Sequence, residues 1–140
     1  MAIKNISPEG NDLAELRSRI RHSAAHVMAE AVLALFPDAQ FAVGPSTSDG
    51  FYYDFAVERS FTPEDLQKIE DHMRDTIEKN LIFEYSEISR TEATERFSGQ
   101  QFKLEIIDSI PDDEAISIYK HGDFVDLCRG PHINSSSDIV

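Results

Sequence analysis

The stretch Arg21-His22-Ser23-Ala24-Ala25-His26 decides the fold, because it sets two imidazoles one helical turn apart near the start of the chain. Side chains at positions i and i+4 of a helix lie about 5–6 Å apart at Cβ, so both rings can converge on one bound atom. The partners that we expect for them, Cys128 and His132, lie near the other end of the sequence. The chain between must therefore fold so that the two stretches meet.

Composition limits the class of protein. A chain of 140 residues with 41% hydrophobic residues is sufficient for one domain with a single core. Its net charge of −13 is opposite to that of domains that hold nucleic acid by the phosphates, so another part must hold most of any RNA substrate. The single cysteine cannot form an internal disulfide, and we find neither a membrane span nor a signal peptide. We therefore expect a cytoplasmic protein with no membrane partner.

The first predicted element is a long amphipathic helix. Apolar residues recur at three- and four-residue steps, which predicts a helix over residues 13–36 after a flexible leader of residues 1–12, with a cap at Asn11 or Asp12. His22 and His26 fall on the side opposite the apolar stripe. Further apolar residues share that side, so we expect the two rings to face a cleft.

The rest of the chain alternates short elements. Because its helices and strands are mixed and its strands follow one another closely, we predict the α+β class, with two layers in which helices pack on a mostly antiparallel sheet. The expected elements are strands at 40–43 and 51–55, a helix at 63–80, a strand at 81–88, a short helix at 90–98, and strands at 102–106, 116–119 and 124–128.

Alternation within two of these strands predicts which side chains point away from the core. In residues 102–106 the outward residues include Lys103. In residues 124–128 the outward residues are Asp126 and Cys128, which share one face, and the residues between them are buried.

The two motifs together supply three imidazoles and one thiolate, a ligand set that zinc accepts in tetrahedral geometry. These residues are His22, His26, Cys128 and His132. An alternative is equally consistent with the pattern. The histidines can be hydrogen-bonded core residues, and the cysteine can be a small buried apolar residue.

Other polar residues also have purely structural interpretations. Lys103 and Glu105 can form a solvated strand face, and Asp126 can be a local turn acceptor. His72 and His121 have no partner in the sequence pattern, so we interpret them as surface residues.

Several motifs follow one another in the sequence: residues 21–26, Gly44-Pro45 followed by residues 50–54, Phe102-Lys103, and residues 125–132. In this order they resemble one protein family, the editing domain of bacterial threonyl-tRNA synthetase. The related domain of alanyl-tRNA synthetases shares the two histidine-containing motifs. The likeness extends from about Leu16 onward and implies the common editing-domain fold, with residues 13–140 as an editing domain and as an N-terminal fragment of a longer synthetase.

This resemblance implies an esterase activity. The domain would hydrolyse the ester that joins a mischarged serine to tRNA(Thr), while the parent enzyme ligates threonine to tRNA(Thr) with ATP. Serine lacks one methyl group relative to threonine, and one methyl(ene) contributes only about 1–3 kcal/mol to discrimination in a pocket. A second site that hydrolyses the serine product would supply the remaining selectivity.

The resemblance also assigns roles residue by residue. His22 and Cys128 would position or activate the water, and Lys103 would polarise the ester or stabilise developing charge. The residues that would bind substrate are His26, Gly44, Tyr53, Asp126 and His132.

The resemblance further implies partners and cofactors. The partners would be the acceptor end of aminoacylated tRNA(Thr) and the catalytic and anticodon-binding domains of a parent enzyme that can be a homodimer. No metal would be required, although zinc stays a candidate at the four residues named above. Two other functions fit the same motifs: a structural zinc-binding module, and a free-standing aminoacyl-tRNA deacylase that edits in trans.

Overall fold

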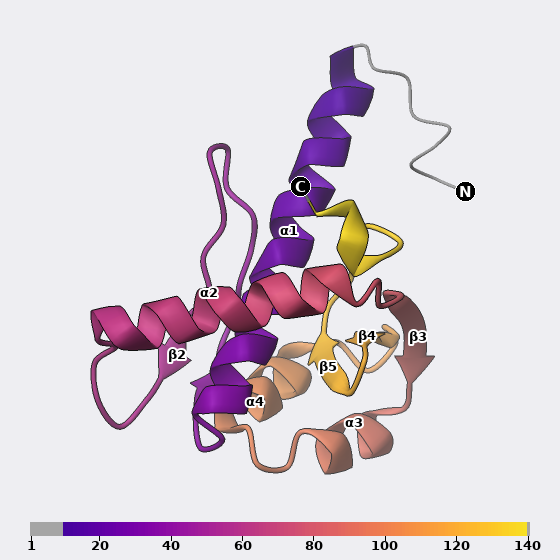
Figure 1. Ribbon diagram of the computed structural model, residues 1–140. Coiled ribbons are helices and arrows are strands. Elements are labelled where there is room, and N and C mark those ends of the chain that lie inside the picture. Colours follow the sequence, from indigo (N-terminus) through magenta and orange to yellow (C-terminus); the bar gives the residue numbers. More distant parts are fainter. Residues whose placement is uncertain (1–9, 140) are drawn as a thin grey trace.

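The computed structural model describes residues 10–139 and confirms the predicted α+β class (Figure 1). Residues 1–9 of the expected leader lie outside the described residues, whereas residues 10–12 belong to the first helix. The elements, in order, are α1 (Gly10–Leu35), β1 (Gln40–Phe41), β2 (Phe55–Ala56), α2 (Pro63–Glu78), β3 (Glu84–Ile88), α3 (Arg90–Arg96), α4 (Gln101–Ser109), β4 (Ile116–His121), β5 (Phe124–Leu127) and the 3₁₀ helix η2 (Ser136–Asp138).

The helix α1 runs through the middle of the fold, and α2 crosses it (Figure 1). It begins at Gly10, so the expected cap at Asn11 or Asp12 is wrong. Its fully buried alanines let neighbouring elements approach closely, and they share one core with α2, β1 and β5. That core comprises Ala25, Ala29, Ala31, Val32, Ala39, Phe41, Tyr53, Ile69 and Phe124. None of the helices among residues 10–139 is long and apolar enough to cross a membrane.

The strands form two groups. All strand pairs among the described residues are antiparallel, which confirms the mostly antiparallel arrangement predicted from the sequence. β3, β4 and β5 make a three-stranded sheet in that order, and β1 pairs only with β2 among the described residues. The helices α3 and α4 contribute to a second core with this sheet, which includes Ala93, Phe97, Ile107, Ile116 and Ile118.

The strand predicted over residues 102–106 is wrong, because these residues form the helix α4. Lys103 and Ile107 are both buried, which is the i, i+4 spacing of one helix face. The segment is rich in good helix formers, and its five-residue alternation was too short to exclude a helix. Two glutamines fix its start against β1: Gln100 accepts from the Phe41 N–H, and Gln40 accepts from the Gln101 N–H.

Two predictions about burial are also wrong. On β5, Phe124 and Asp126 are the buried residues, and Val125 and Leu127 are half-buried. The sheet therefore turns Asp126 into the core instead of away from it. His121 is not on the surface: it is 1% exposed, and its ring stacks on Phe83.

The hydroxyl of Ser136 ties η2 to the end of α2. It accepts from the Leu81 N–H at 2.8 Å and donates to the Thr76 carbonyl at 2.8 Å, and Ser136 is fully buried. The neighbouring Ser137 is exposed. A buried N–H that loses its acceptor carries a desolvation penalty of about 1–3 kcal/mol.

We predict that Ser136→Ala lowers the free energy of unfolding by about 1–3 kcal/mol, because the Leu81 N–H loses its side-chain acceptor. Urea denaturation of both chains measures the change. The matched control is Ser137→Ala, for which we expect a change within about 0.5 kcal/mol. Equal effects of the two substitutions would contradict this role of Ser136.

Candidate functional site

Four potential ligand atoms converge where α1 meets the turn after β5. α1 supplies His22 and His26, and the turn supplies Cys128 and His132. Their ligand atoms all lie within 4.8 Å of one another. The Sγ atom of Cys128 is 3.4 Å from Nε2 of His22 and 3.2 Å from Nε2 of His132. The two stretches that the sequence paired therefore do meet.

A buried serine orients this cluster. The Oγ atom of Ser23 lies 2.8 Å from Nδ1 of His132 and accepts from the Ile133 N–H at 3.1 Å. Ser23 is fully buried. Sequence reasoning missed it, since a serine between two helical histidines carries no pattern of its own.

The second part of the site is a buried ion pair. Nζ of Lys103 lies 2.6 Å from Oδ1 of Asp126, and the two residues are 3% and 2% exposed. The ammonium group also donates to the Ala42 carbonyl and to the Tyr53 hydroxyl, each at 2.8 Å. The hydroxyl of Tyr53 in turn donates to Oδ2 of Asp126 at 2.5 Å. The ammonium group of Lys103 thus makes two hydrogen bonds and one close ion pair.

Gly44 is placed against the Tyr53 ring. A Cβ atom built at Gly44 would overlap that ring, so only glycine lets the backbone approach the ring this closely. A similar constraint acts at Gly130, which has a φ of +80° and faces the Tyr119 hydroxyl. Side chains at either position would displace a tyrosine beside the site.

One cavity of about 320 Å³ brings these groups together. Every predicted site residue except His132 lines it, so the two histidines of α1, the cysteine and the ion pair share one space. Sequence reasoning missed the rest of the lining, which supplies the apolar rim and one arginine: Val43, Pro45, Ile106, Leu127, Arg129 and Gly130.

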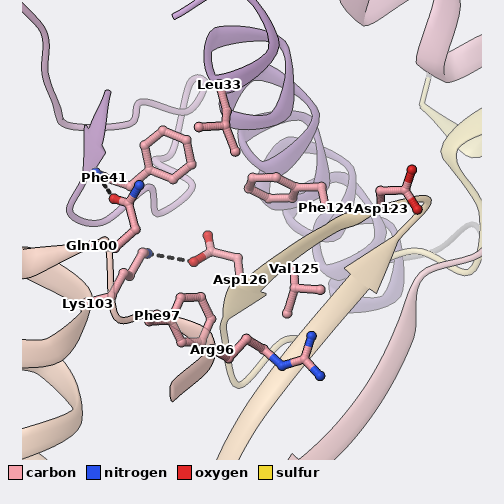
Figure 2. A pocket seen from close by; sticks show the side chains of 10 residues that line it. All are labelled: Leu33, Phe41, Arg96, Phe97, Gln100, Lys103, Asp123, Phe124, Val125 and Asp126. Carbon is pink, nitrogen blue, oxygen red and sulfur yellow. Dashed lines mark hydrogen bonds and ion pairs between the residues drawn. The ribbon is translucent and has the colours of Figure 1, made fainter. Parts of the chain in front are cut away.

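Lys103 and Asp126 also line a second cavity of about 290 Å³. Figure 2 shows the two side chains reaching toward each other from α4 and β5, with Gln100 bonded to the backbone of Phe41. The remaining lining is largely apolar and includes Leu33, Phe97, Phe124 and Val125. The ion pair therefore belongs to the walls of two cavities.

Burial keeps the cluster neutral. Desolvation lowers the pKa of His26 and His132 well below the usual value, and the neighbouring imidazoles lower both further. The pKa of His22 is lowered mainly by burial, although the Pro131 carbonyl and Asp126 oppose the shift. Burial also raises the pKa of the Cys128 thiol to about 12. At neutral pH the metal-free site thus holds uncharged rings and a thiol.

The donor set fits zinc. A tetrahedral site with Zn–N of ~2.0–2.1 Å and Zn–S of ~2.3 Å places a sulfur and a nitrogen ligand atom about 3.5–3.6 Å apart. The two sulfur–nitrogen distances, 3.4 and 3.2 Å, are slightly shorter than this separation. His22, His26, Cys128 and His132 could therefore hold the ion, with Ser23 as the hydrogen-bond partner that orients His132.

Comparisons with known proteins identify the family. Residues 116–139, which contain β5 and the Cys128–His132 turn, match the family described as "Threonyl and Alanyl tRNA synthetase second additional domain". This part of the chain is therefore similar to the second additional domain. It is similar to threonine–tRNA ligases, with 54% identity over 84% of the chain for the protein of Nitrosococcus oceani, 52% over 90% for that of Coxiella burnetii, and 51% over 86% for one of Dehalococcoides mccartyi.

The similarity covers only part of each relative. The chain spans about a fifth of the length of the curated relatives it matches: 19% for the first two and 20% for the third. The expected family is thus confirmed, and the chain corresponds to one domain of these enzymes. The arrangement offers neutral imidazoles that can accept a proton and a buried cation beside them, which are groups that general acid–base and electrostatic catalysis use.

We predict that the metal-free chain loses stability as pH falls from 7.5 to 5.5. The unfolded pKa of a histidine is about 6.5, and the folded pKa values of His26 and His132 lie below it, so the unfolded chain binds more protons as pH falls. The stability is fully present above the unfolded pKa. Each of these two rings should reduce the free energy of unfolding by up to about 1.4 kcal/mol over this interval.

Urea denaturation at pH 7.5 and pH 5.5 in the presence of a chelator tests this expectation. The variant His26→Gln removes one of the two rings, so its loss between the two pH values should be smaller by about 1.4 kcal/mol. An unchanged pH dependence in that variant would show that His26 does not stay neutral in the folded chain.

Proposed function

We propose that this domain edits tRNA(Thr) by hydrolysing the ester that joins a mischarged serine to the terminal ribose. The observation that carries the proposal is the single cavity lined by His22, His26, Cys128 and the Lys103–Asp126 ion pair. Supporting it is the identity of 51–54% with threonine–tRNA ligases over 84–90% of the chain. The proposed catalytic residues are His22, Lys103 and Cys128.

His22 is the proposed general base. It is the least buried imidazole of the cluster, and its lowered pKa leaves it neutral at pH 7, so it can accept a proton from an attacking water. Cys128 lies 3.4 Å from its Nε2 atom, where a thiol can hold the water in place. His26 lines the same cavity as a proposed substrate-binding residue, whereas His132 does not line it and contacts Cys128 at 3.2 Å, so its proposed part in substrate binding is indirect.

Lys103 is the proposed electrostatic group. A preorganised cation stabilises the negative charge that develops on the ester oxygen, and this effect is large in a site without bulk water. Because the ammonium group already contacts the Ala42 carbonyl, the Tyr53 hydroxyl and Asp126, the ester oxygen must replace one of these contacts. Asp126, which accepts from Tyr53 and pairs with Lys103, is proposed to orient these two groups and the substrate ammonium.

Selectivity follows from size. Gly44 and Tyr53 form a wall of the 320 Å³ cavity, and we propose that this wall contacts the terminal nucleoside and the amino acid. A wall that excludes the methyl group of threonine would discriminate by about 1–3 kcal/mol. The serine ester then reacts faster than the threonine ester.

The net charge of −13 limits the RNA contact to the acceptor end. We propose that the parent enzyme is a cytoplasmic threonine–tRNA ligase that uses ATP and can be a homodimer, and that its catalytic and anticodon-binding domains hold the rest of the tRNA. A free-standing deacylase is the other form of the same proposal. Efficient deacylation by this chain at low concentration would favour that form.

Single-turnover deacylation of Ser-tRNA(Thr) and Thr-tRNA(Thr) tests the function. We expect the chain to hydrolyse the serine ester faster than the threonine ester. His22→Ala and Lys103→Ala should each reduce the rate on the serine ester by about 10²-fold or more. Cys128→Ala should also reduce it. Rates in all three variants equal to that of the unchanged chain would refute the assignment.

Two controls separate chemistry from folding. Glu105→Ala alters an exposed residue of the same helix as Lys103, so its rate should not change. Lys103→Ala leaves Asp126 as an unpaired buried charge, which destabilises by about 3–5 kcal/mol. The double variant Lys103→Met with Asp126→Asn removes both charges and should fold more stably than Lys103→Ala, yet remain inactive.

The convergence of four ligand atoms within 4.8 Å favours one alternative, a structural zinc module. Zinc held there would supply Lewis acidity and a bound water of lowered pKa. We expect untagged protein to contain less than stoichiometric zinc, and a chelator to leave its melting temperature unchanged. Stoichiometric zinc, with a large loss of stability in the chelator, would support the structural module instead.

A further inference from the structure

We propose that Ser23 is a positioning residue that fixes His132 in the tautomer with its proton on Nε2. The inference rests on the proposed function of the cluster, because it concerns how His22 and Cys128 are held in the state that acts on water. Ser23 lies on α1 between the two histidines that face the cavity, and its side chain points to the turn that carries His132.

The hydrogen-bond count at Ser23 is the first step. A serine hydroxyl has one proton and two lone pairs. One lone pair receives the Ile133 N–H at 3.1 Å, and Nδ1 of His132 lies 2.8 Å from the same oxygen. Ser23 is fully buried, so both contacts occur away from water. A hydroxyl that already accepts one backbone proton is well placed to donate its own to Nδ1.

The second step concerns Cys128. If Nδ1 of His132 accepts from Ser23, the ring proton is on Nε2, which lies 3.2 Å from the cysteine sulfur. The sulfur also accepts from the Gly130 N–H at 3.3 Å. Its own thiol proton is then free to be donated to Nε2 of His22, 3.4 Å away.

The last step is the His22 ring. Its Nε2 atom accepts from the thiol, which leaves the ring proton on Nδ1. The backbone of Pro131 raises the pKa of this ring, as an acceptor for that proton would. Each proton from the Ile133 N–H to the Cys128 thiol then meets an acceptor while all groups stay neutral. The chain runs from the Ile133 N–H through Ser23, His132 and Cys128 to His22.

The opposite tautomer of His132 breaks this match. With the proton on Nδ1, Ser23 would accept twice, and the Nε2 lone pair would face Cys128. The thiol could donate to Nε2 of His132 and His22 could donate to the sulfur, but the proton of the buried Ser23 hydroxyl would meet no acceptor in its two contacts. Because an unpaired buried polar atom is costly, the donor–acceptor count selects the Nε2–H form.

The consequence for hydrolysis lies at His22, the least buried ring of the cluster. His22 lines the cavity, and in this tautomer its Nε2 lone pair is held by the Cys128 thiol, so an attacking water must take the place of the thiol before Nε2 can accept its proton. Ser23 does not line the cavity and acts only through His132 and Cys128.

Nitrogen-15 NMR of the zinc-free chain, labelled at histidine, tests the proposal directly. We expect Nε2 of His132 to carry the proton and Nδ1 to be unprotonated in the unchanged chain. In Ser23→Ala we expect a mixture of both tautomers, together with a fall of about 10-fold or more in kcat for Ser-tRNA(Thr) and a KM within about twofold.

The matched control is Ser136→Ala, which also removes a fully buried hydroxyl that accepts from a backbone N–H but lies outside the cavity lining. It should lower stability without changing kcat or the His132 signals.

A proton on Nδ1 of His132 in the unchanged chain overturns the proposal, and this measurement needs no variant. A change in Ser23→Ala of the tautomer alone or of kcat alone also overturns it. An unchanged chain that hydrolyses neither ester would refute the proposed function, while the NMR result would still decide the tautomer.

Discussion

The ion pair between Lys103 and Asp126 is the interaction on which the rest of the site depends. It joins α4 to β5 inside the core, and Tyr53 connects both partners to the segment between β1 and β2. Removing two charges from water costs several kcal/mol for each ion, and a close contact with further hydrogen bonds offsets that cost. A hydrophobic pair of equal volume would stabilise a fold about as well. The retention of charge in a cavity wall therefore supports a chemical role.

The neutral cluster and the ion pair are adjacent, and His26 links them. Its Nε2 atom lies 3.7 Å from Oδ2 of Asp126, and its ring centroid lies 4.3 Å from that of His132. Burial lowers the pKa of His26, and the nearby charge of Lys103 lowers it further. The site thus keeps one balanced pair of charges, and the imidazoles of His22, His26 and His132 stay neutral.

The parts of the fold that sequence predicted are those with a long period or a distinctive motif. The apolar stripe of α1 spans several turns, so the sequence pattern predicted a helix there. The two histidine-containing motifs predicted the contact between His22 and Cys128 without any knowledge of the elements between them. The short alternation around Lys103 did not distinguish a strand from a helix. Two groups carried no sequence signal: the Ala42 carbonyl, which is backbone, and Ser23, whose partner is more than one hundred positions away.

The proton arrangement bears on whether zinc and hydrolysis compete for the same atoms. Zinc would need the Cys128 thiolate and a free lone pair on Nε2 of His132. Burial raises the thiol pKa to about 12, and the Ser23 contact directs the His132 proton onto Nε2. A zinc ion would therefore have to displace two protons that already have partners. The hydrogen-bonded chain from Ser23 to His22 forms without a metal, and this favours water as the species that His22 and Cys128 meet in the cavity.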